Sequence, residues 1–318
     1  MKTWSKLGLL TLFVLLAGLG SLLLGAAGDL ANLDALTAWR ILRFARLPRT
    51  LATVLAGAAL AVSGCVIQGV LGNSLASPGI IGVNAGAGLA VTALCAAGVL
   101  SGWAIAAGAF GGALAAALLV TLTAQKMGAS RSTVILGGVA VNSFLNALSQ
   151  AVTDLVPDAA ALSVDFRVGG FSAVSEIRLI PASVLILISL AIVMTLGNDL
   201  ELLSLGEETA QGLGMNVKVM RTVLLTLAAV LAGAAVSFSG LLGFVGLIVP
   251  HVTRRLLGRD RSILLPACAL LGAGFVTLCD LAARLVFAPY ELSAGVLLSV
   301  LGGPFFLWLL MKGGHRHG

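Results

Sequence analysis

The segment RILRFARLPRT places Arg40, Arg43, Arg46 and Arg49 three residues apart, between two long apolar stretches. A guanidinium is permanently charged and can bind a carboxylate through two parallel hydrogen bonds, so this arginine segment suits an acidic partner. Helical residues three apart drift by about 60° each, and Pro48 is expected to interrupt the helix. The segment therefore predicts a broad basic patch. The alternative is a solvated edge with snorkelling side chains.

Hydrolysis by serine and histidine is a second candidate chemistry, because SFSG, residues 237–240, precedes His251. A nucleophile and its base must come within hydrogen-bond reach. The predicted topology places His251 near the opposite membrane face, so Ser239 is better explained as a small packing residue. An intramembrane serine protease stays as a minor alternative.

Other chemistry is largely missing. None of the five lysines follows a glycine, so the chain has no phosphate-binding P-loop and no ATPase of its own. We expect it to bind no cofactor. The four cysteines fall in apolar stretches without metal-ligand spacing, and for the tail histidines, His315 and His317, a solvated tail is favoured over a metal site.

The composition indicates an integral membrane protein. The chain has 318 residues, of which 59% are hydrophobic and 10% charged, and its mean hydropathy is +1.08. We expect one all-α transmembrane domain over residues 1–318. At about 20 apolar residues per crossing it has ten spans. They cover residues 7–27, 50–71, 80–100, 103–124, 132–153, 179–197, 222–239, 241–254, 263–286 and 293–311, the eighth being short.

Ten spans put both termini on one side. A cytoplasmic N-terminus leaves twelve of the nineteen lysines and arginines in the cytoplasm and seven outside, which fits the positive-inside bias. The arginine segment is a local exception to that bias, which suggests a use for it. Asp280 is nearly the only carboxylate within a span, and it can pair with Arg284, one helical turn on, near the outer end of the ninth span.

An internal echo indicates an inverted repeat. LAGAALAVSG at 55–64 returns as LAGAAVSFSG at 231–240, each after an Arg-Thr pair and each before a stretch interrupted by glycine and proline. These segments belong to the second and seventh spans, which cross in opposite senses. We therefore expect spans 2–5 and 7–10 to form inverted repeats, an arrangement typical of transporters.

The cytoplasmic loop of residues 198–221 is predicted to dock a partner, with self-packing as the alternative. Ser204 and Glu207 form a capping-box pattern that would start a short helix, and Gly212 or Gly214 would end it. Apolar side chains that lipid cannot cover give the helix a docking face. They are Leu205, Ala210, Leu213 and Met215.

The fifth span, STVILGGVAVNSFLNALSQ, is predicted to line a pathway between two copies of the chain. It sets a glycine pair beside polar side chains that are costly to expose to lipid, although ordinary packing within the bundle would also accommodate them. The turn that precedes it would act as a cytoplasmic gate. The pathway and gate candidates are Ser130, Ser132, Thr133, Gly137, Gly138, Asn142 and Asn146.

Four segments resemble a known family over nearly the whole chain: RLPRTLATVLAGAALAVSGCVIQGVLGNSLASPGIIGVNAGAG, LSLGEETAQGLGM, GLLGFVGLIVPHVTRRLLGRD and DLAARLVFAPYELSAGVLLSVLGGPFFLWLL. They are similar to the FecCD-type permeases of type II ABC importers for iron-siderophores, haem and cobalamin. The resemblance implies a homodimer, or a heterodimer with a close paralogue, in a bacterial or archaeal cytoplasmic membrane. It also implies two ATPase subunits that use ATP and Mg²⁺, a periplasmic or lipid-anchored binding protein, and contact with lipid but not with nucleic acid.

The resemblance also assigns roles to residues. Arginines at the positions of Arg46, Arg49 and Arg284 would receive glutamates of the binding protein. Where many siderophore permeases of this family have a tryptophan followed by Gly-Ser-Leu, this chain reads DFRVGGFSAV at 165–174. This departure leaves the chelate open between ferric siderophore, haem and cobalamin. A secondary carrier stays as the rival function. The coupling residues seated on the ATPase would be Leu205, Gly206, Glu207, Glu208, Ala210, Leu213 and Gly214.

Overall fold

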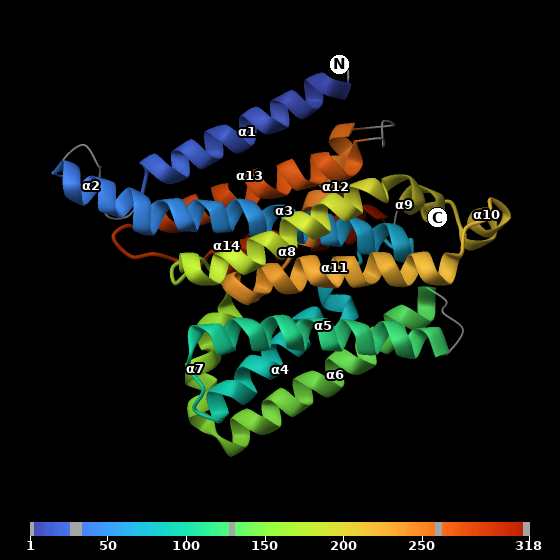
Figure 1. The fold of residues 1–318 in the computed structure, drawn as a ribbon, viewed down its shortest axis with the longest axis horizontal. Helices are drawn as coiled ribbons and strands as arrows, with labels where there is room; N and C mark the ends of the chain where they lie inside the picture. Colours follow the sequence, from blue (N-terminus) through green and yellow to red (C-terminus); the bar gives the residue numbers. More distant parts are fainter. Residues whose placement is uncertain (1–2, 26–33, 127–130, 258–262, 314–318) are drawn as a thin grey trace.

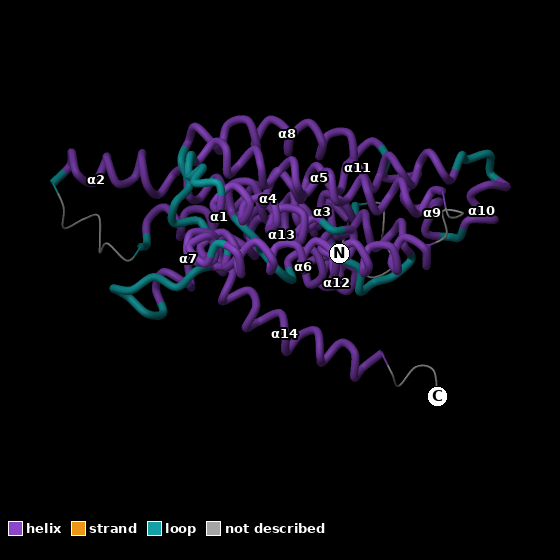
Figure 2. The backbone as a smooth tube through the Cα atoms, turned by 90° about the horizontal axis from the view of Figure 1, so that it is seen from below, coloured by secondary structure: helices purple, strands orange, loops and turns teal. Residues whose placement is uncertain are grey.

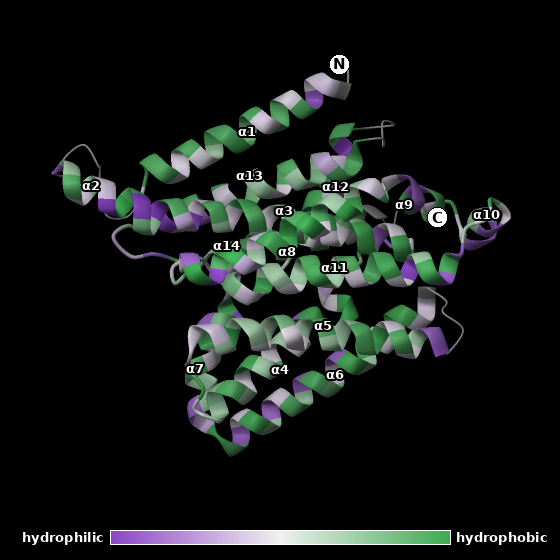
Figure 3. Cartoon of the chain, in the orientation of Figure 1, coloured by the Kyte–Doolittle hydropathy of each residue, from purple (hydrophilic) through white to green (hydrophobic). Residues whose placement is uncertain are grey.

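The computed structural model describes residues 3–25, 34–126, 131–257 and 263–313, and every regular element in these ranges is a helix. The long helices lie side by side, and their middle portions are hydrophobic while hydrophilic residues gather toward the two ends (Figures 1 and 3). The elements are α1 (Thr3–Leu23), α2 (Ala35–Ile41), the π-helical turn η2 (Leu42–Arg46), α3 (Leu47–Leu71), the 3-10 turn η3 (Pro78–Ile81), α4 (Val83–Ala96), α5 (Gly102–Lys126), α6 (Arg131–Leu155), α7 (Pro157–Val168), α8 (Glu176–Thr195), α9 (Gly197–Ser204), α10 (Glu207–Gly212), α11 (Val217–Ser239), α12 (Val245–Leu257), α13 (Leu264–Leu285) and α14 (Ala294–Gly313).

Each of the ten predicted spans coincides with one of these helices. Seven helices of the described chain are long and apolar enough to cross a membrane, and α4 and α14 are shorter apolar helices. Helix α12 has 13 residues, which rise only about 20 Å, less than the hydrocarbon thickness of a bilayer. The helical fold is therefore confirmed, whereas the count of ten crossings stays a prediction.

The expected interruption at Pro48 is wrong. Residues 35–71 form one continuous helical stretch, in which the π-helical turn η2 directly precedes α3 and Pro48 sits in the first turn of α3. Proline lacks an N–H and its ring crowds the carbonyl four residues earlier. A wider π turn at that place accommodates the ring without ending the helix.

Small residues allow the central helices to approach closely. Helix α3 packs against α11, α12 and α13, and α4 packs against α5. A Cβ atom at Gly57 of α3 would overlap the carbonyl of Gly272 in α13, and one at Gly86 of α4 would overlap that of Gly112 in α5. Close backbone approach of this kind is how membrane helices gain packing energy where lipid supplies no hydrophobic drive between them.

The two ends of the bundle differ in content. Helix α1 begins at the end that carries α9 and α10, whereas α2 and α7 lie at the opposite end (Figure 1). Helix α14 diverges from the rest of the bundle as it runs back toward the α9–α10 end (Figure 2). The arginine segment and the loop of residues 198–221, called the coupling loop below, thus belong to opposite ends. This agrees with the predicted sidedness, although which end faces the cytoplasm is still a prediction.

Candidate functional site

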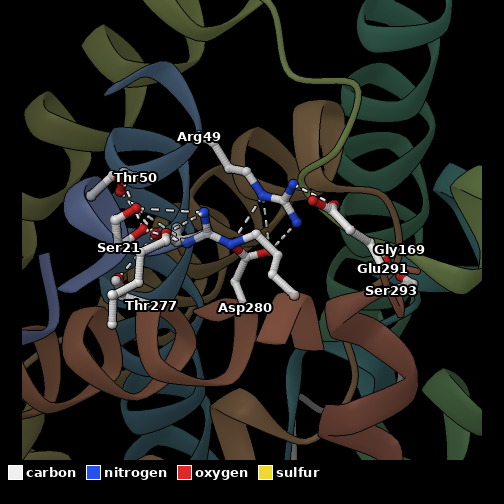
Figure 4. A network of polar contacts seen from close by, with 11 residues as sticks. Ser21, Arg49, Thr50, Gly169, Thr277, Asp280, Glu291 and Ser293 are labelled. Carbon is white, nitrogen blue, oxygen red and sulfur yellow. Dashed lines mark hydrogen bonds and ion pairs between the residues drawn. The ribbon is translucent and has the colours of Figure 1, made fainter. Parts of the chain in front are cut away.

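A cluster of charged side chains joins α3 and α13 at the end of the bundle where α1 stops (Figure 4). Asp280 of α13 is fully buried between two arginines. Arg49 donates from Nη2 to Asp280 Oδ1 at 2.9 Å and from Nε to Oδ2 at 3.0 Å. Arg284 Nε lies 3.2 Å from Asp280 Oδ2. The predicted pairing of Asp280 with Arg284 is confirmed, and Arg49 supplies a second cation.

Two arginines of this cluster also hold the C-terminal end of α1. Arg46 Nη1 donates to the carbonyls of Leu22 and Leu23 at 3.0 and 2.6 Å, and Arg284 Nη2 donates to Ser21 Oγ at 2.8 Å. The last carbonyls of a helix lack intrahelical donors and carry the negative end of its dipole, so guanidinium groups stabilise them. Arg46 is only 5% exposed and Arg284 only 3%. Both therefore attach α1 to the bundle.

Arg49 also reaches Glu291, in the segment of residues 286–293 that joins α13 to α14. Its Nη1 donates to Glu291 Oε2 at 2.7 Å, and the Glu291 side chain is 36% exposed. Just beyond Glu291, the Ser293 hydroxyl donates to the carbonyl of Gly169, which also accepts the N–H of Gly295 at 3.1 Å. The segment thus connects Arg49 with the turn that ends α7.

The outer cluster is defined as Arg46, Arg49, Asp280, Arg284 and Glu291. Because Asp280 is fully buried, removing either of its arginines would weaken the compensation of a buried charge. Losing one partner of such a pair costs about 3–5 kcal/mol.

The predicted broad basic patch is wrong, since most of the arginine segment is engaged internally. Arg40 is exposed, but Arg43 binds Glu176 at the start of α8 and lies 5.6 Å above the ring of Phe44. The three docking candidates do come together in space. Sequence reasoning missed Glu291, although it is the only acidic residue after Asp280, a signal that could have drawn attention to it.

The coupling loop contains two short helices, α9 and α10, at the opposite end of the bundle. The predicted capping box is wrong. The Ser204 hydroxyl donates to the Glu201 carbonyl within α9, and α10 begins after Gly206, whose φ of 121° suits glycine. Glu207 instead binds Arg221 of α11, a guanidinium that is 4% exposed. Helix α10 ends at Gly212, one of the two predicted positions.

The exposed surface of this loop is smaller than expected. Leu205 and Leu213 are 61% and 65% exposed, so they do offer apolar surface. Ala210 is completely buried and packs in the core, so its expected place on the docking face is wrong. Met215 is partly buried against the core. Among the other coupling candidates, Glu208 and Gly214 are exposed, while Gly206 and Glu207 are half-buried.

Helix α6 holds the pathway candidates, and one face of it anchors the turn η3. Gly138 is buried against Ile80, and a Cβ atom there would overlap the Ile80 carbonyl. Asn142 Nδ2 donates to the carbonyls of Gly79 and Ile80 at 2.8 and 3.2 Å. These two residues therefore pack within the bundle, as the alternative explanation holds.

The remaining gate and pathway candidates lie on freer parts of α6. Ser132 and Asn146 are exposed, Thr133 is half-buried, and a Cβ atom at Gly137 would meet nothing within 4 Å. Ser130 lies outside the described residues. Ser132 and Asn146 thus place exposed polar groups on a face of α6 that also carries the exposed Leu136 and Val139.

Arg167 of α7 is a residue that sequence reasoning did not single out. Its Nη2 donates to Thr92 of α4 at 3.0 Å and to Ser149 of α6 at 2.6 Å. Both hydroxyls are buried, and no spacing in the sequence links residues on three separate helices. Arg167 thus ties the end of α7 to α4 and to the helix with the exposed polar face.

The serine and histidine of the protease alternative have other partners. Ser237 and Ser239 donate to the carbonyls of Ala234 and Ala235 within α11, and the His251 ring packs edge-on against Phe305. The described residues contain no group of three histidine, cysteine, aspartate or glutamate side chains placed to hold a metal ion. This arrangement gives the protease alternative no support.

The fold, the outer cluster and the short helices α9 and α10 together define a class of protein. It is a multi-pass helical membrane protein with a charged cluster at one end and a short helical element at the other. The chain belongs to the FecCD transport family, whose model matches residues 7–312. The predicted resemblance is therefore confirmed.

Relatives in this family are permeases with several cargoes. The chain is 36% identical to the hemin transport system permease protein HmuU of Yersinia pestis, over 96% of this chain and 95% of that protein. It is 34% identical to the Fe(3+)-citrate import system permease protein YfmD of Bacillus subtilis, over 96% and 94%. Identity to the vitamin B12 import system permease protein BtuC of Salmonella typhi is 38%, over 95% and 94%.

A solved structure has the same fold. It is a metal-chelate type ABC transporter in an inward-facing conformation, with a TM-score of 0.88, 29% identity, and coverage of 96% of this chain and 98% of that one. The high coverage on both sides means that nearly the whole chain, rather than one part of it, shares this architecture.

Proposed function

We propose that the chain is the permease subunit of an ATP-driven importer that carries a metal chelate, a ferric siderophore or haem with cobalamin as a further candidate, into the cytoplasm. The observation that carries the proposal is the family match over residues 7–312, to permeases named for hemin, Fe(3+)-citrate and vitamin B12. The site of action is the cytoplasmic membrane of a bacterium or archaeon.

Energy would come from partner subunits. The chain has no P-loop, so two ATPase subunits would bind ATP and Mg²⁺ and seat on α9 and α10 of a dimer, formed by two copies or by a close paralogue. The exposed leucines Leu205 and Leu213 support this seat, because a cytoplasmic loop has no lipid to cover them. The polar face of α6 would line the pathway between the two copies.

The secondary carrier is less well supported. Among the described residues Asp280 is the only fully buried carboxylate, and it forms ion pairs with two arginines. A proton-coupled carrier needs a buried carboxylate that is free to gain and lose a proton. Asp280 therefore suits a structural role better than a relay.

The outer cluster would receive the binding protein. Arginine can hold an incoming carboxylate by two hydrogen bonds. Of the three candidates, Arg46 and Arg284 are almost completely buried, whereas the Arg49 side chain is 13% exposed. Arg49 would therefore make the direct contact, while Arg46 and Arg284 hold the cluster in place.

The test is the affinity of the binding protein for the complete importer in lipid nanodiscs. Arg49→Gln should weaken it by about five- to fiftyfold and flatten its salt dependence, because a partly desolvated charge pair is lost. Arg40→Gln is the matched control, since it removes the same charge from an exposed arginine of the same segment. Equal affinities for wild type and Arg49→Gln would contradict docking at this cluster.

A further inference from the structure

We propose that Glu291 occupies, in the undocked permease, the place on Arg49 that a carboxylate of the binding protein takes on docking. Docking would then exchange an internal ion pair for an external one. The inference rests on the proposed function, because it requires a binding protein that contacts this end of the molecule.

The two carboxylates on Arg49 differ in how readily they can leave. Asp280 is fully buried, binds Arg49 through both of its oxygens and also contacts Arg284. Glu291 is 36% exposed and accepts a single hydrogen bond, from Nη1. Exposed ion pairs are weak, whereas a buried pair cannot be broken without leaving an uncompensated charge. Glu291 is therefore the exchangeable partner.

The hydrogen bonds of Arg49 leave little choice of docking position. Its Nε and Nη2 face Asp280, so Nη1 carries the donors that point away from the buried pair. Glu291 already occupies Nη1 at 2.7 Å. An incoming carboxylate on Nη1 would meet the like charge of Glu291, and displacing Glu291 relieves this repulsion.

The release of Glu291 would act on the turn after α7. Ser293, two residues beyond Glu291, donates to the carbonyl of Gly169. A cavity of about 560 Å³ lies beside this contact, with Phe166, Gly170, Arg178, Gly240 and Ser293 among its lining residues. The exchange at Arg49 would thus loosen the segment that contributes Ser293 to the lining of this cavity.

Glu291→Gln tests the exchange directly, with Glu176→Gln as the matched control. Glu176 also pairs with an arginine of the same segment, and its side chain is 38% exposed against 36% for Glu291. Both changes add one unit of positive charge at the same end. We expect Glu291→Gln to tighten binding of the binding protein to the importer in nanodiscs about two- to fivefold more than Glu176→Gln does. Equal effects, or weaker binding by Glu291→Gln, would overturn the exchange.

A nitroxide label at Tyr290→Cys gives a second readout, because Tyr290 is 80% exposed and adjoins Glu291. We expect docking to increase the mobility of the label in otherwise unchanged protein. In the Glu291→Gln background the label should be mobile before docking and change no further. A spectrum that docking leaves unchanged would also overturn the exchange.

The two proposals fail in different ways. If Arg49→Gln binds the binding protein as tightly as wild type does, docking at the outer cluster is wrong. If Arg49→Gln weakens binding while Glu291→Gln and Glu176→Gln behave alike, docking stands and only the exchange is wrong.

Discussion

Arg221 is a buried cation with few partners, at the end of the molecule opposite the outer cluster. Its side chain is 4% exposed, its Nη2 binds Glu207, and its Nε has no hydrogen-bond partner. Glu207 is the first residue of α10, so this single ion pair ties α10 to α11. A buried guanidinium depends strongly on its carboxylate, because little water is present to solvate the charge when the carboxylate is removed.

We therefore expect Glu207→Gln to uncouple ATP hydrolysis from transport. The change should cost about 1–2 kcal/mol of local stability, less than for a fully buried pair because Glu207 is 39% exposed. In proteoliposomes, substrate uptake per ATP hydrolysed should fall severalfold while the complex stays assembled. Glu201→Gln is the control, since Glu201 is an exposed glutamate outside the named coupling residues and pairs with none of the described arginines. The two variants behaving alike would contradict the coupling role.

Single residues show which contacts a sequence can reveal. The pairing of Asp280 with Arg284 was predictable, because residues four apart share one helix face. The pairing of Arg49 with Asp280 joins residues 231 positions apart, and no periodicity indicates it. The capping box failed for a related reason. Glu207 binds the buried guanidinium of Arg221, 14 residues on, and this interaction takes the place of the local hydrogen bond.

At the scale of elements, α6 separates into two faces with different tasks. Gly138 and Asn142 attach it to η3, whereas Ser143 and Asn146 are exposed. Polar side chains that face neither the bundle nor water are costly in a bilayer, so the exposed face requires an aqueous neighbour. The proposed pathway between two copies of the chain would provide one.

Cysteine labelling tests this division of α6. Ser143→Cys and Asn146→Cys should react with a charged, membrane-impermeant thiol reagent at rates at least about tenfold above Leu187→Cys, a 57% exposed position on the apolar helix α8. They should also form crosslinks between two copies of the chain. Reaction with lipid-soluble reagents alone would contradict a pathway along α6.

Element positions were largely predictable, because long apolar runs mark helices whatever their neighbours are. The continuous helix through Pro48 was not. The penalty of a proline can be absorbed by a π-helical turn, and no pattern in the local sequence indicates such a turn. Likewise, the burial of Ala210 depends on how α10 packs.

For the whole molecule, α11 is the element that joins the two ends. It begins at the coupling loop, four residues before Arg221, and it ends at Ser239 beside the turn after α7. There the Ser239 carbonyl accepts the N–H of Gly170 at 2.7 Å, and the N–H of Leu241 reaches the carbonyl of Phe166 at 2.9 Å. A rigid helix fixed at both ends can transmit a displacement from one to the other.

The contact between the end of α11 and the turn after α7 depends on Gly240. Its φ is 67°, and a Cβ atom there would meet the Phe166 carbonyl at 2.5 Å. Gly240→Ala should therefore cost about 1–3 kcal/mol, through backbone strain and the displacement of Phe166. Because the outer cluster and the coupling loop are untouched, docking affinity and basal ATP hydrolysis should persist.

The expected loss is confined to communication between the ends. In nanodiscs, the stimulation of ATP hydrolysis by the binding protein should fall at least about fivefold in Gly240→Ala, since the strain acts on the contact that joins α11 to α7. Gly303→Ala is the control, because it lies within α14 and a Cβ atom there meets nothing within 4 Å. A Gly240→Ala importer that keeps both its docking affinity and its full stimulation would show that the signal travels by another route, in which case α11 only fills the core.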